Sequence, residues 1–332
     1  MTTRKLWDGA EIPALGLGCW AIGGPWTAGG LQAGWGDVDD AASVRAIHAG
    51  VDAGIRFFDT AQTYGAGHSE TVLGEALSGK PDVRIGTKVG YAIDTATRQM
   101  IGPDTSRLAI IKSIEASLTR LRRERIDLVH LHANALAINE AEGVFDTLDT
   151  LRKAGKIGAY GWSTDFPDRA TAFAKRDGFV SVQHALNVFF RADALLAVIE
   201  KEGLLSINRS PLAMGLLGGK YDGSSTMAKT DIRSNTVDWL AYFKDGKVAP
   251  DYAVQLAAVR DLLCSDGRSL VQGALCWIWG RSNRTLPIPG FRTVAQVQDL
   301  AGALAKGPLA PEIMAQIEAV ILREAEGEPR ER

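Results

Sequence analysis

The sequence predicts an α/β protein whose strands close into a (β/α)8 TIM barrel. Along its 332 residues, a short apolar run, a turn and an amphipathic segment recur eight times. Alternation of this kind is typical of a parallel sheet covered by helices. Eight such units favour closure of the sheet into a barrel. No linker or change in composition divides the chain, so we expect residues 1–332 to form one domain.

A small hairpin is expected ahead of the first barrel strand. Residues 3–14 hold two short runs separated by Asp8-Gly9, which is a type I′ turn signal. We expect this hairpin to cap the bottom of the barrel. Residues 15–18 then form the first strand.

A long loop is expected between the first strand and the first helix. Residues 20–40 are rich in Gly and Trp and show no periodicity. A loop of this length is usually functional rather than a simple connection. Asp39 or Asp40 can cap a helix that runs to about Ala53, and Gly54 ends it.

The other elements follow in regular alternation. Strands are expected at residues 57–59, 83–88, 126–132, 157–163, 180–184, 204–208 and 285–288. Helices are expected at residues 69–77, 106–122, 139–153, 168–175, 192–201, 253–263, 270–279, 294–305 and 311–322. Some of these are extra helices in the C-terminal part of the chain. Residues 324–332 are charged and contain Gly and Pro, which predicts a disordered tail.

The composition excludes several functional classes. The net charge is −2, with 46% hydrophobic and 23% charged residues, as in ordinary globular proteins. A nucleic-acid partner would need a basic face, and no apolar run reaches the ~20 residues of a membrane span. Three widely spaced cysteines suggest no disulfide framework, so we expect a cytoplasmic protein. The oligomeric state stays open.

Polar side chains stand where several strands end. Asp59, Lys88 and His132 each close an apolar run, and Tyr64 follows on the next loop after Asp59. In a barrel, the carboxyl ends of neighbouring strands lie within side-chain reach. We therefore expect an anion, a cation, an imidazole and a phenol to converge on one face.

This set of groups suits proton delivery to a carbonyl oxygen. An ammonium at Lys88 would lower the pKa of Tyr64, and Asp59 would supply its counter-charge. His132 can bind and orient the substrate oxygen. No Ser or Cys is paired with a base, which argues against covalent hydrolysis. Protonation of a carbonyl without a nucleophile calls for a hydride donor, and so for a cofactor.

A phosphate site is expected near the end of the barrel. Residues 288–293 end the eighth strand and lead into a helix. Loops after the seventh and eighth strands often bind phosphate at a helix N-terminus. Arg292 suits the 2′-phosphate of NADPH, although a surface ion pair is an equally plausible role for it.

At this point the chain resembles the aldo-keto reductases, from about residue 6 to residue 304. The motifs that carry the resemblance lie at residues 16–20, 58–65, 87–88, 126–132, 161–164, 210–220 and 288–293. The resemblance implies a barrel with an extended NADPH, and a catalytic tetrad of Asp59, Tyr64, Lys88 and His132 in which Tyr64 is the acid. It also implies these cofactor contacts: Trp20, Asp59, Ser163, Thr164, Gln183, Ser210, Pro211, Leu212, Gly215, Leu216, Lys220, Gly290, Phe291, Arg292, Gln296 and Asp299.

The chain departs from the family pattern at several positions. Thr164 stands where the family usually has Asn, which puts an amide contact to the nicotinamide in doubt. Arg209 replaces an aromatic residue that often stacks on that ring. Leu300 stands where Asn is common near the adenine. After His132 come Ala133-Asn134, where the family has an aromatic residue or Arg, and Pro.

Aromatic residues of the long loop are candidates for the substrate pocket. Trp20 comes directly after the first strand and is expected to line it, and Trp26 and Trp35 are further candidates. These three residues could instead simply pack in the interior.

Two other patterns point to functions that we consider and set aside. Gly16-x-Gly18 lacks the helix that a dinucleotide fingerprint needs directly after it. His130 and His132 share a strand face and could bind metal with His184, but the chain has only five histidines, so no metal is expected.

We therefore expect an NADPH-dependent reductase of a small carbonyl compound, either an aldehyde, a ketone or a sugar. One alternative is an NAD(P)-linked sugar or polyol dehydrogenase that works oxidatively; Arg292 argues against NADH. Another is a non-catalytic NADPH-binding regulatory subunit, in which the His132 position tends to be Asn. The sequence does not identify the substrate.

Overall fold

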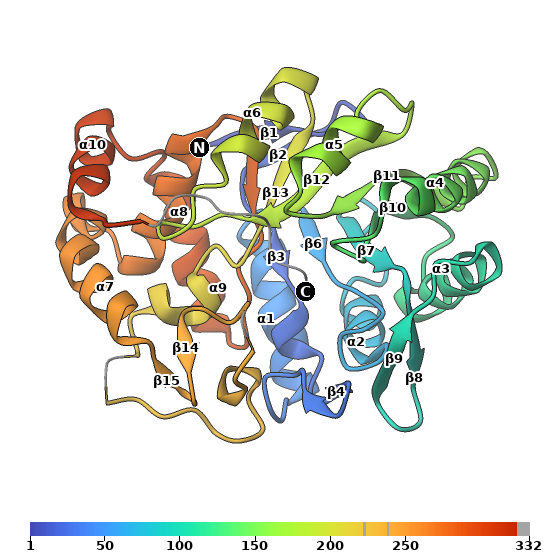
Figure 1. The fold of residues 1–332 in the computed structure, drawn as a ribbon, viewed down its shortest axis with the longest axis horizontal. Coiled ribbons are helices and arrows are strands. Elements are labelled where there is room, and N and C mark those ends of the chain that lie inside the picture. Colours follow the sequence, from blue (N-terminus) through green and yellow to red (C-terminus); the bar gives the residue numbers. More distant parts are fainter. Residues whose placement is uncertain (222–223, 238, 324–332) are drawn as a thin grey trace.

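Eight parallel strands form the centre of the computed structural model, which describes residues 1–221, 224–237 and 239–323 (Figure 1). The barrel strands are β3 (Leu17–Gly18), β6 (Phe57–Asp59), β7 (Arg84–Val89), β10 (Ile126–Leu131), β11 (Ile157–Ser163), β12 (Phe179–Ala185), β13 (Leu205–Arg209) and β16 (Thr285–Pro287). Each pairs in parallel with its neighbour in chain order. The predicted (β/α)8 barrel is therefore confirmed.

The first and last strands meet at glycine. Gly18 pairs in parallel with Gly290, and its amide donates to the carbonyl of Pro289 at 2.9 Å. A Cβ on Gly18 would lie only 2.7 Å from the carbonyl oxygen of Ile288. A side chain at this position would push the two strands apart, so closure of the barrel requires glycine here.

Helices cover the outside of the barrel (Figure 1). They are α1 (Asp40–Asp52), α2 (His68–Ala76), α3 (Arg107–Leu121), α4 (Ile138–Lys153), α5 (Pro167–Phe173), α6 (Asp193–Glu202), α8 (Leu270–Arg281) and α9 (Val294–Gly302). Two further helices, α7 (Pro250–Leu263) and α10 (Pro311–Val320), pack on each other and on α8. Asp39 caps α1 as predicted, because its side chain accepts from the amide of Ala42 at 3.0 Å. Helices α7 and α10 are the predicted extra helices in the C-terminal part of the chain.

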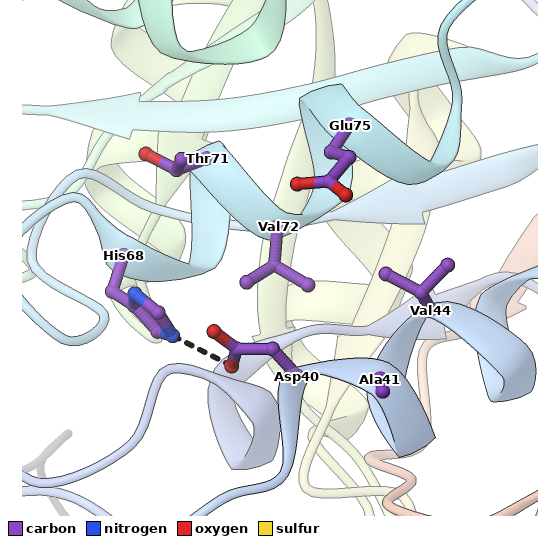
Figure 2. A pocket seen from close by; sticks show the side chains of 7 residues that line it. All are labelled: Asp40, Ala41, Val44, His68, Thr71, Val72 and Glu75. Carbon is purple, nitrogen blue, oxygen red and sulfur yellow. Dashed lines mark hydrogen bonds and ion pairs between the residues drawn. The ribbon is translucent and has the colours of Figure 1, made fainter.

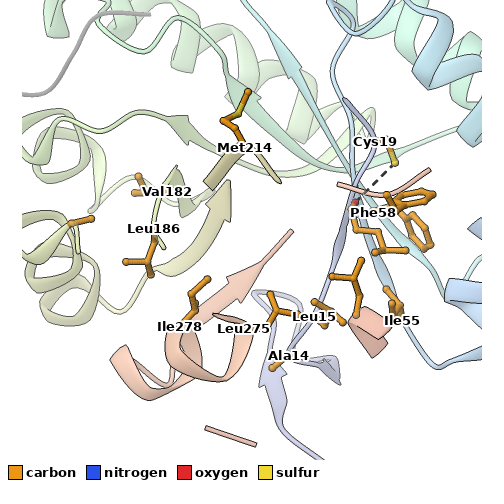
Figure 3. Packing of buried hydrophobic residues seen from close by; sticks show 14 of the residues in the cluster. Ala14, Leu15, Cys19, Ile55, Phe58, Val182, Leu186, Met214, Leu275 and Ile278 are labelled. Atoms are coloured by element: carbon orange, nitrogen blue, oxygen red, sulfur yellow. Dashed lines mark hydrogen bonds between the residues drawn. The ribbon is translucent and has the colours of Figure 1, made fainter. Parts of the chain in front are cut away.

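The hydrophobic core has two parts. The larger part lies between strands and helices, and Figure 3 shows some of its members, among them Phe58, Val182 and Leu275. The smaller part fills the bottom of the barrel, where Leu6 and Ile12 of the N-terminal hairpin pack with apolar side chains of the strands. The hairpin therefore plugs the barrel from below, as predicted.

The turn of this hairpin differs from the prediction. Strands β1 (Thr3–Lys5) and β2 (Glu11–Pro13) are joined by residues 6–10, and the amide of Leu6 donates to the carbonyl of Ala10 at 2.8 Å. The expected two-residue type I′ turn at Asp8-Gly9 is wrong. In this wider loop the amide of Gly9 donates to the carbonyl of Leu6 at 3.1 Å, and the side chain of Asp8 accepts from the amide of Ala10 at 3.1 Å.

Two segments expected to be loops form a second sheet. Residues 20–40 contain a 3₁₀ turn and the short hairpin of β4 (Thr27–Ala28) and β5 (Leu31–Gln32). The segment after β7 contains the hairpin of β8 (Tyr91–Asp94) and β9 (Gln99–Pro103), which projects from the barrel in Figure 1. Strands β4 and β9 pair in parallel and join the two hairpins into one four-stranded sheet.

The remaining differences are shifted helix ends and one further hairpin. The helix expected from residue 253 begins at Pro250, and the helix expected to reach residue 305 becomes a 3₁₀ turn after Gly302. Residues 243–248 form a further short hairpin, of β14 (Phe243–Lys244) and β15 (Lys247–Val248). The predicted tail at residues 324–332 lies outside the described part of the chain.

Candidate active site

The four predicted catalytic residues lie together at the carboxyl ends of neighbouring strands. Asp59 ends β6, Lys88 lies near the end of β7, and His132 directly follows β10. Tyr64 lies in the turn between β6 and α2. Parallel pairing of β6 with β7, and of β7 with β10, places these ends side by side.

Lys88 is the centre of the cluster. Its ammonium donates to Asp59 Oδ2 at 2.6 Å, to the carbonyl of Thr60 at 2.8 Å and to the Tyr64 hydroxyl at 3.1 Å. The side chain is fully buried. All three ammonium hydrogens therefore have partners, which is what allows a lysine to stay charged in the interior.

Asp59 is held from both sides. While Oδ2 accepts from Lys88, Oδ1 accepts from the Gln183 amide at 2.7 Å. Gln183 belongs to β12, on the other side of the barrel mouth. The sequence placed Gln183 only among the cofactor contacts, but it also fixes the carboxylate.

The pKa of Tyr64 differs from the prediction. Burial raises this pKa above its usual value of 10.0, and the nearby charge and hydrogen bond of Lys88 oppose the rise without overcoming it. The prediction that Lys88 lowers the pKa of Tyr64 overall is wrong for the protein without a bound cofactor. Desolvation of the phenolate raises this pKa by more than the Lys88 ammonium, which also pairs with Asp59, lowers it. Tyr64 is consequently protonated at neutral pH.

His132 is held by aromatic edges. Its ring lies edge-on to Tyr64, with 6.1 Å between centroids, and edge-on to Tyr91, with 5.6 Å. Burial and the charge of Lys88 hold its pKa well below 6.5. The imidazole is therefore neutral, and it can donate one N–H to a substrate oxygen.

A cavity of about 650 Å³ opens above these groups. Asp59, Tyr64 and His132 are among the residues that line it. Of the predicted cofactor residues, it is also lined by Trp20, Ser163, Gln183, Ser210, Pro211, Leu212, Gly215, Lys220, Gly290, Phe291, Arg292, Gln296 and Asp299. The structure thus brings nearly all of the predicted residues to one cavity, whose lining includes both tetrad residues and residues of α9.

Comparison with known proteins identifies the family. A family model described as "Aldo/keto reductase family" matches residues 14–322, which is most of the chain. The chain belongs to the aldo/keto reductase family. It is an oxidoreductase with the barrel of that family.

Individual relatives agree with this assignment. The chain is 29% identical over 299 residues to "Aldo-keto reductase YhdN" of Bacillus subtilis, a match covering 88% of this chain and 85% of that protein. It is 30% identical to the solved glycerol dehydrogenase AKR11B4 of Gluconobacter oxydans, with a TM-score of 0.80 and coverage of 96% and 94%. A Klebsiella pneumoniae aldo/keto reductase solved with NADP and acetate shares the fold, at a TM-score of 0.70, 22% identity and coverage of 100% and 99%.

Two predicted cofactor residues do not line the cavity of this aldo/keto reductase. The Thr164 hydroxyl is fully buried and donates to the carbonyl of Asn134 at 2.8 Å. Leu216 is fully buried in the larger hydrophobic cluster. Asn134 lines the cavity instead. Thr164 points into the protein because its hydroxyl accepts from the amide of Phe166 at 3.2 Å, which closes a tight turn.

Hydrogen bonds to oxygen atoms hold Arg292 in place. Its guanidinium donates to the backbone carbonyls of Trp35, at 3.1 Å, and of Asp37. Its backbone amide donates to the Gln296 side chain, at 2.8 Å, and Gln296 with Thr293 forms the capping box of α9. The predicted phosphate ligand thus lies at a helix N-terminus, as expected. Backbone carbonyls of the long loop hold its side chain there.

The outer wall of the cavity is aromatic and apolar. The three predicted tryptophans line it together with Tyr91 and Met100 of the second sheet. Trp20 stacks on Tyr64, with 5.8 Å between centroids and an interplanar angle of 18°. The indole of Trp20 is fixed by a 2.9 Å hydrogen bond to the carbonyl of Ala33.

Two segments distant in sequence meet over the cavity. We call residues 31–37 together with residues 231–235 the lid. The amide of Ile232 donates to the carbonyl of Gly34 at 2.8 Å, and Asn235 donates to the carbonyl of Gln32 at 2.6 Å. Arg233 pairs with Asp231 at 2.6 Å and lies 4.7 Å from the ring centroid of Trp35. The lid is therefore closed by specific polar and cation–π contacts.

Sequence reasoning missed several cavity residues. Tyr91 and Met100 lie in a hairpin that had no readable signal, and Arg233 lies in a short 3₁₀ turn at Ile232–Ser234 that the sequence did not indicate. Arg209 was noted only as a departure from the family pattern, yet it lines the cavity at the end of β13. Its position as the last residue of a barrel strand was the signal that could have identified it.

Other parts of the described structure offer weaker candidates. A cavity of about 350 Å³ lies between α1 and α2 (Figure 2), where His68 pairs with Asp40 at 2.9 Å. Nowhere in the described residues do three His, Cys, Asp or Glu side chains gather to hold a metal ion. None of the described helices is long and apolar enough to cross a membrane.

Proposed function

We propose that this aldo/keto reductase uses NADPH to reduce a small carbonyl substrate, with Tyr64 as the general acid. The observation that carries the proposal is the ammonium of Lys88, which touches both the Asp59 carboxylate and the Tyr64 hydroxyl beside His132. No nucleophile paired with a base lies among the described tetrad residues. The cluster therefore supplies a proton and a neutral hydrogen-bond donor.

The nicotinamide supplies the hydride when it is bound. The chain supplies the rest of the chemistry. His132 donates a hydrogen bond to the substrate oxygen and orients the carbonyl. Tyr64 gives its proton to that oxygen as negative charge develops there. Lys88 then stabilises the phenolate that remains, and Asp59 holds Lys88 in place.

The shifted pKa values fit these roles. Burial raises the pKa of Tyr64, so its proton is present at the pH of the reaction. Burial and Lys88 lower the pKa of His132, so the imidazole donates a hydrogen bond without competing as an acid. Tyr64 is a weak acid until substrate charge appears, which restricts proton transfer to the bound carbonyl.

The residues along the cavity fit a nicotinamide dinucleotide. Ser163 and Asn134 offer a hydroxyl and an amide near the tetrad, and Lys220 and Arg292 offer cations farther along. The neighbouring Klebsiella protein was solved with NADP. Arg292 would exchange the Trp35 and Asp37 carbonyls for the 2′-phosphate, because a guanidinium binds phosphate more strongly than carbonyls.

Replacing the acid tests the reaction. Tyr64→Phe should lower turnover of a reducible aldehyde by about a thousandfold, because general acid catalysis is worth about that much. Binding of NADPH, measured by fluorescence titration, should change little. Tyr160→Phe removes a phenol away from the cavity, at the Asp149 contact, and serves as the matched control. Turnover by Tyr64→Phe within tenfold of the wild type would refute the role.

Replacing the phosphate ligand tests the cofactor. Arg292→Ala should raise the Kd of NADPH at least about tenfold, because it removes a charge-assisted contact to the 2′-phosphate. The Kd of NADH, which lacks this phosphate, should change much less. Equal effects on the two cofactors would mean that Arg292 does not bind the phosphate.

Oxidation of a small polyol is the second candidate. It rests on the 30% identity to a glycerol dehydrogenase. The same four residues could catalyse this oxidation, because a phenolate at Tyr64, stabilised by Lys88, can accept the proton of the alcohol. Initial rates with glycerol and NADP⁺, compared with rates for aldehydes and NADPH, decide which direction is efficient.

A further inference from the structure

We infer that Arg209 places a fixed positive charge beside the nicotinamide ring, so that the protein binds NADPH more tightly than NADP⁺. The ring of NADPH is neutral, whereas the ring of NADP⁺ carries a positive charge. Like charges held close together in a site of low dielectric repel each other. This inference rests on the proposed function, because it assumes that a nicotinamide cofactor occupies the cavity.

The position of Arg209 follows from the barrel. It is the last residue of β13 and pairs in register with Ala185 at the end of β12. Together with Ser163 and Gln183 it forms a row of cavity-lining residues on three adjacent strand ends. These residues lie next to the tetrad, and the strand ends that carry both groups make the floor of the cavity.

The nicotinamide must lie over this floor. Hydride reaches the carbon whose oxygen Tyr64 protonates, so the ring has to come within about 3–3.5 Å of a carbonyl that touches Tyr64. The aromatic wall on the other side of the cavity leaves the strand ends as the polar surface for the ring. The charge of Arg209 already acts on both Tyr64 and His132, after larger effects of burial and Lys88 on their pKa values.

An ion pair with Asp165 holds the guanidinium of Arg209 in place. Arg209 pairs with Asp165, whose side chain is 7% exposed. The carboxylate of Asp165 also accepts from the amide of Ala185 at 3.0 Å. Arg209 lines the cavity and Asp165 does not, so the cation lies between its counter-ion and the cofactor site. The pair is therefore oriented with its positive end toward the ring.

The other cations of the cavity do not provide this discrimination. Lys88 does not line the cavity, because Asp59, Thr60 and Tyr64 enclose its ammonium, and Arg233 belongs to the lid. Arg292 lies at the opposite end of the cavity, where it would meet a phosphate that both redox forms carry. Lys220 follows the 3₁₀ turn at Ala213–Gly218 and is not at a strand end, so Arg209 is the one of these five cations that lies at a strand end without being part of the catalytic cluster.

The test measures cofactor binding and requires no turnover. Kd values for NADPH and NADP⁺ are determined by fluorescence titration for the wild type and for Arg209→Met. The quantity of interest is the Kd of NADP⁺ divided by the Kd of NADPH. We expect this ratio to be about ten in the wild type and to fall about tenfold in Arg209→Met. Arg292→Met is the matched control; it should weaken both cofactors equally and leave the ratio unchanged.

A second variant changes the ratio in the opposite direction. Asp165→Asn removes the counter-ion, so the bare charge of Arg209 should weaken NADP⁺ further and raise the ratio several-fold. The double variant Arg209→Met/Asp165→Asn leaves no unpaired buried charge at the site, and it should give the low ratio of Arg209→Met. It keeps the test available if the single Arg209 variant fails to fold.

The outcomes separate this inference from the proposed function. A wild-type ratio near one, or a ratio that Arg209→Met leaves unchanged, overturns the inference while the NADPH assignment stands. If Arg209→Met changes only the KM of anionic carbonyl substrates, Arg209 binds substrate and the inference is also overturned. Failure of the wild type to bind either cofactor would instead refute the proposed function.

Discussion

The floor and the outer wall of the cavity are built in different ways. The floor consists of strand ends, where Asp59, Lys88 and Gln183 are buried and joined by hydrogen bonds of 2.6 and 2.7 Å. The wall consists of two inserted hairpins that are held together by the short β4–β9 pairing. The floor is tied to the rigid barrel, which suits fixed chemistry. The wall depends on contacts between insertions, which suits a changeable choice of substrate.

The strongest test of the floor is Lys88→Met. It should lower turnover by at least about a thousandfold, because the Tyr64 phenolate loses its stabilising charge. It should also destabilise the fold by about 3–5 kcal/mol, because Asp59 is left buried and unpaired. Urea unfolding and aldehyde reduction measure the two effects. The double variant Lys88→Met/Asp59→Asn should recover stability but not turnover; recovery of both would mean that the floor is only structural.

A change in the wall should act on substrate binding instead. Trp26→Ala removes an aromatic surface from the cavity, so we expect KM for an aromatic aldehyde to rise about tenfold while kcat stays within a few-fold. Steady-state kinetics measures both constants. Leu108→Ala, at an exposed position of α3, is the control. A drop in kcat as large as that expected for Lys88→Met would erase the distinction between wall and floor.

The lid should control how fast the cofactor leaves. Arg233→Met breaks the ion pair with Asp231 and the contact with Trp35, so the rate of NADPH release should rise about tenfold. A stopped-flow chase with excess NADP⁺ measures this rate. Lys229→Met changes an exposed lysine of the neighbouring segment and should leave the rate near that of the wild type. An unchanged rate in Arg233→Met would show that the lid does not retain the cofactor.

A last prediction concerns the stability of the fold and two histidines below the floor. Burial lowers the pKa of His184 to about 4 and that of His130 to about 3, and their rings bond to Ser206 and Ser181. The unfolded chain binds these protons below about pH 6.5 and the folded chain does not. The free energy of unfolding should therefore fall as the pH drops from about 6.5 to about 4, by up to about 1.4 kcal/mol per unit for each histidine.

Urea unfolding at several pH values in this window checks the effect. His184→Gln removes one titrating group, so its pH slope should be smaller than that of the wild type by the share of one histidine. The slope is the relevant quantity, because the substitution also changes the absolute stability. Equal slopes in the two proteins would mean that His184 titrates normally in the folded state.

The sequence predicted the floor because each of its residues ends a recognisable strand. Asp59, Lys88 and His132 follow apolar runs, and the barrel rule alone brings them together. The side-chain direction at Thr164 was not readable, since a local turn bond to Phe166 decides it. The pKa of Tyr64 was not readable either, because it depends on how completely the folded protein excludes water.

The wall could not be predicted for a different reason. Strands β4 and β9 are short, and they pair with each other although about seventy residues separate them in the chain. Local propensity does not reveal a pairing of that kind. The lid has the same property, since Gly34 and Ile232 meet only in the folded barrel.

The β4–β9 pairing also limits how this enzyme could be redesigned. A graft that exchanged residues 26–32 alone would leave β9 paired with β8 on one side, but its other edge would lose the partner that β4 provides. The same holds for a graft of residues 91–103 alone. Residues 26–32 and 91–103 therefore form one structural unit, although they are encoded in two separate parts of the gene. Selectivity would therefore be transplanted between relatives by moving both pieces in a single step.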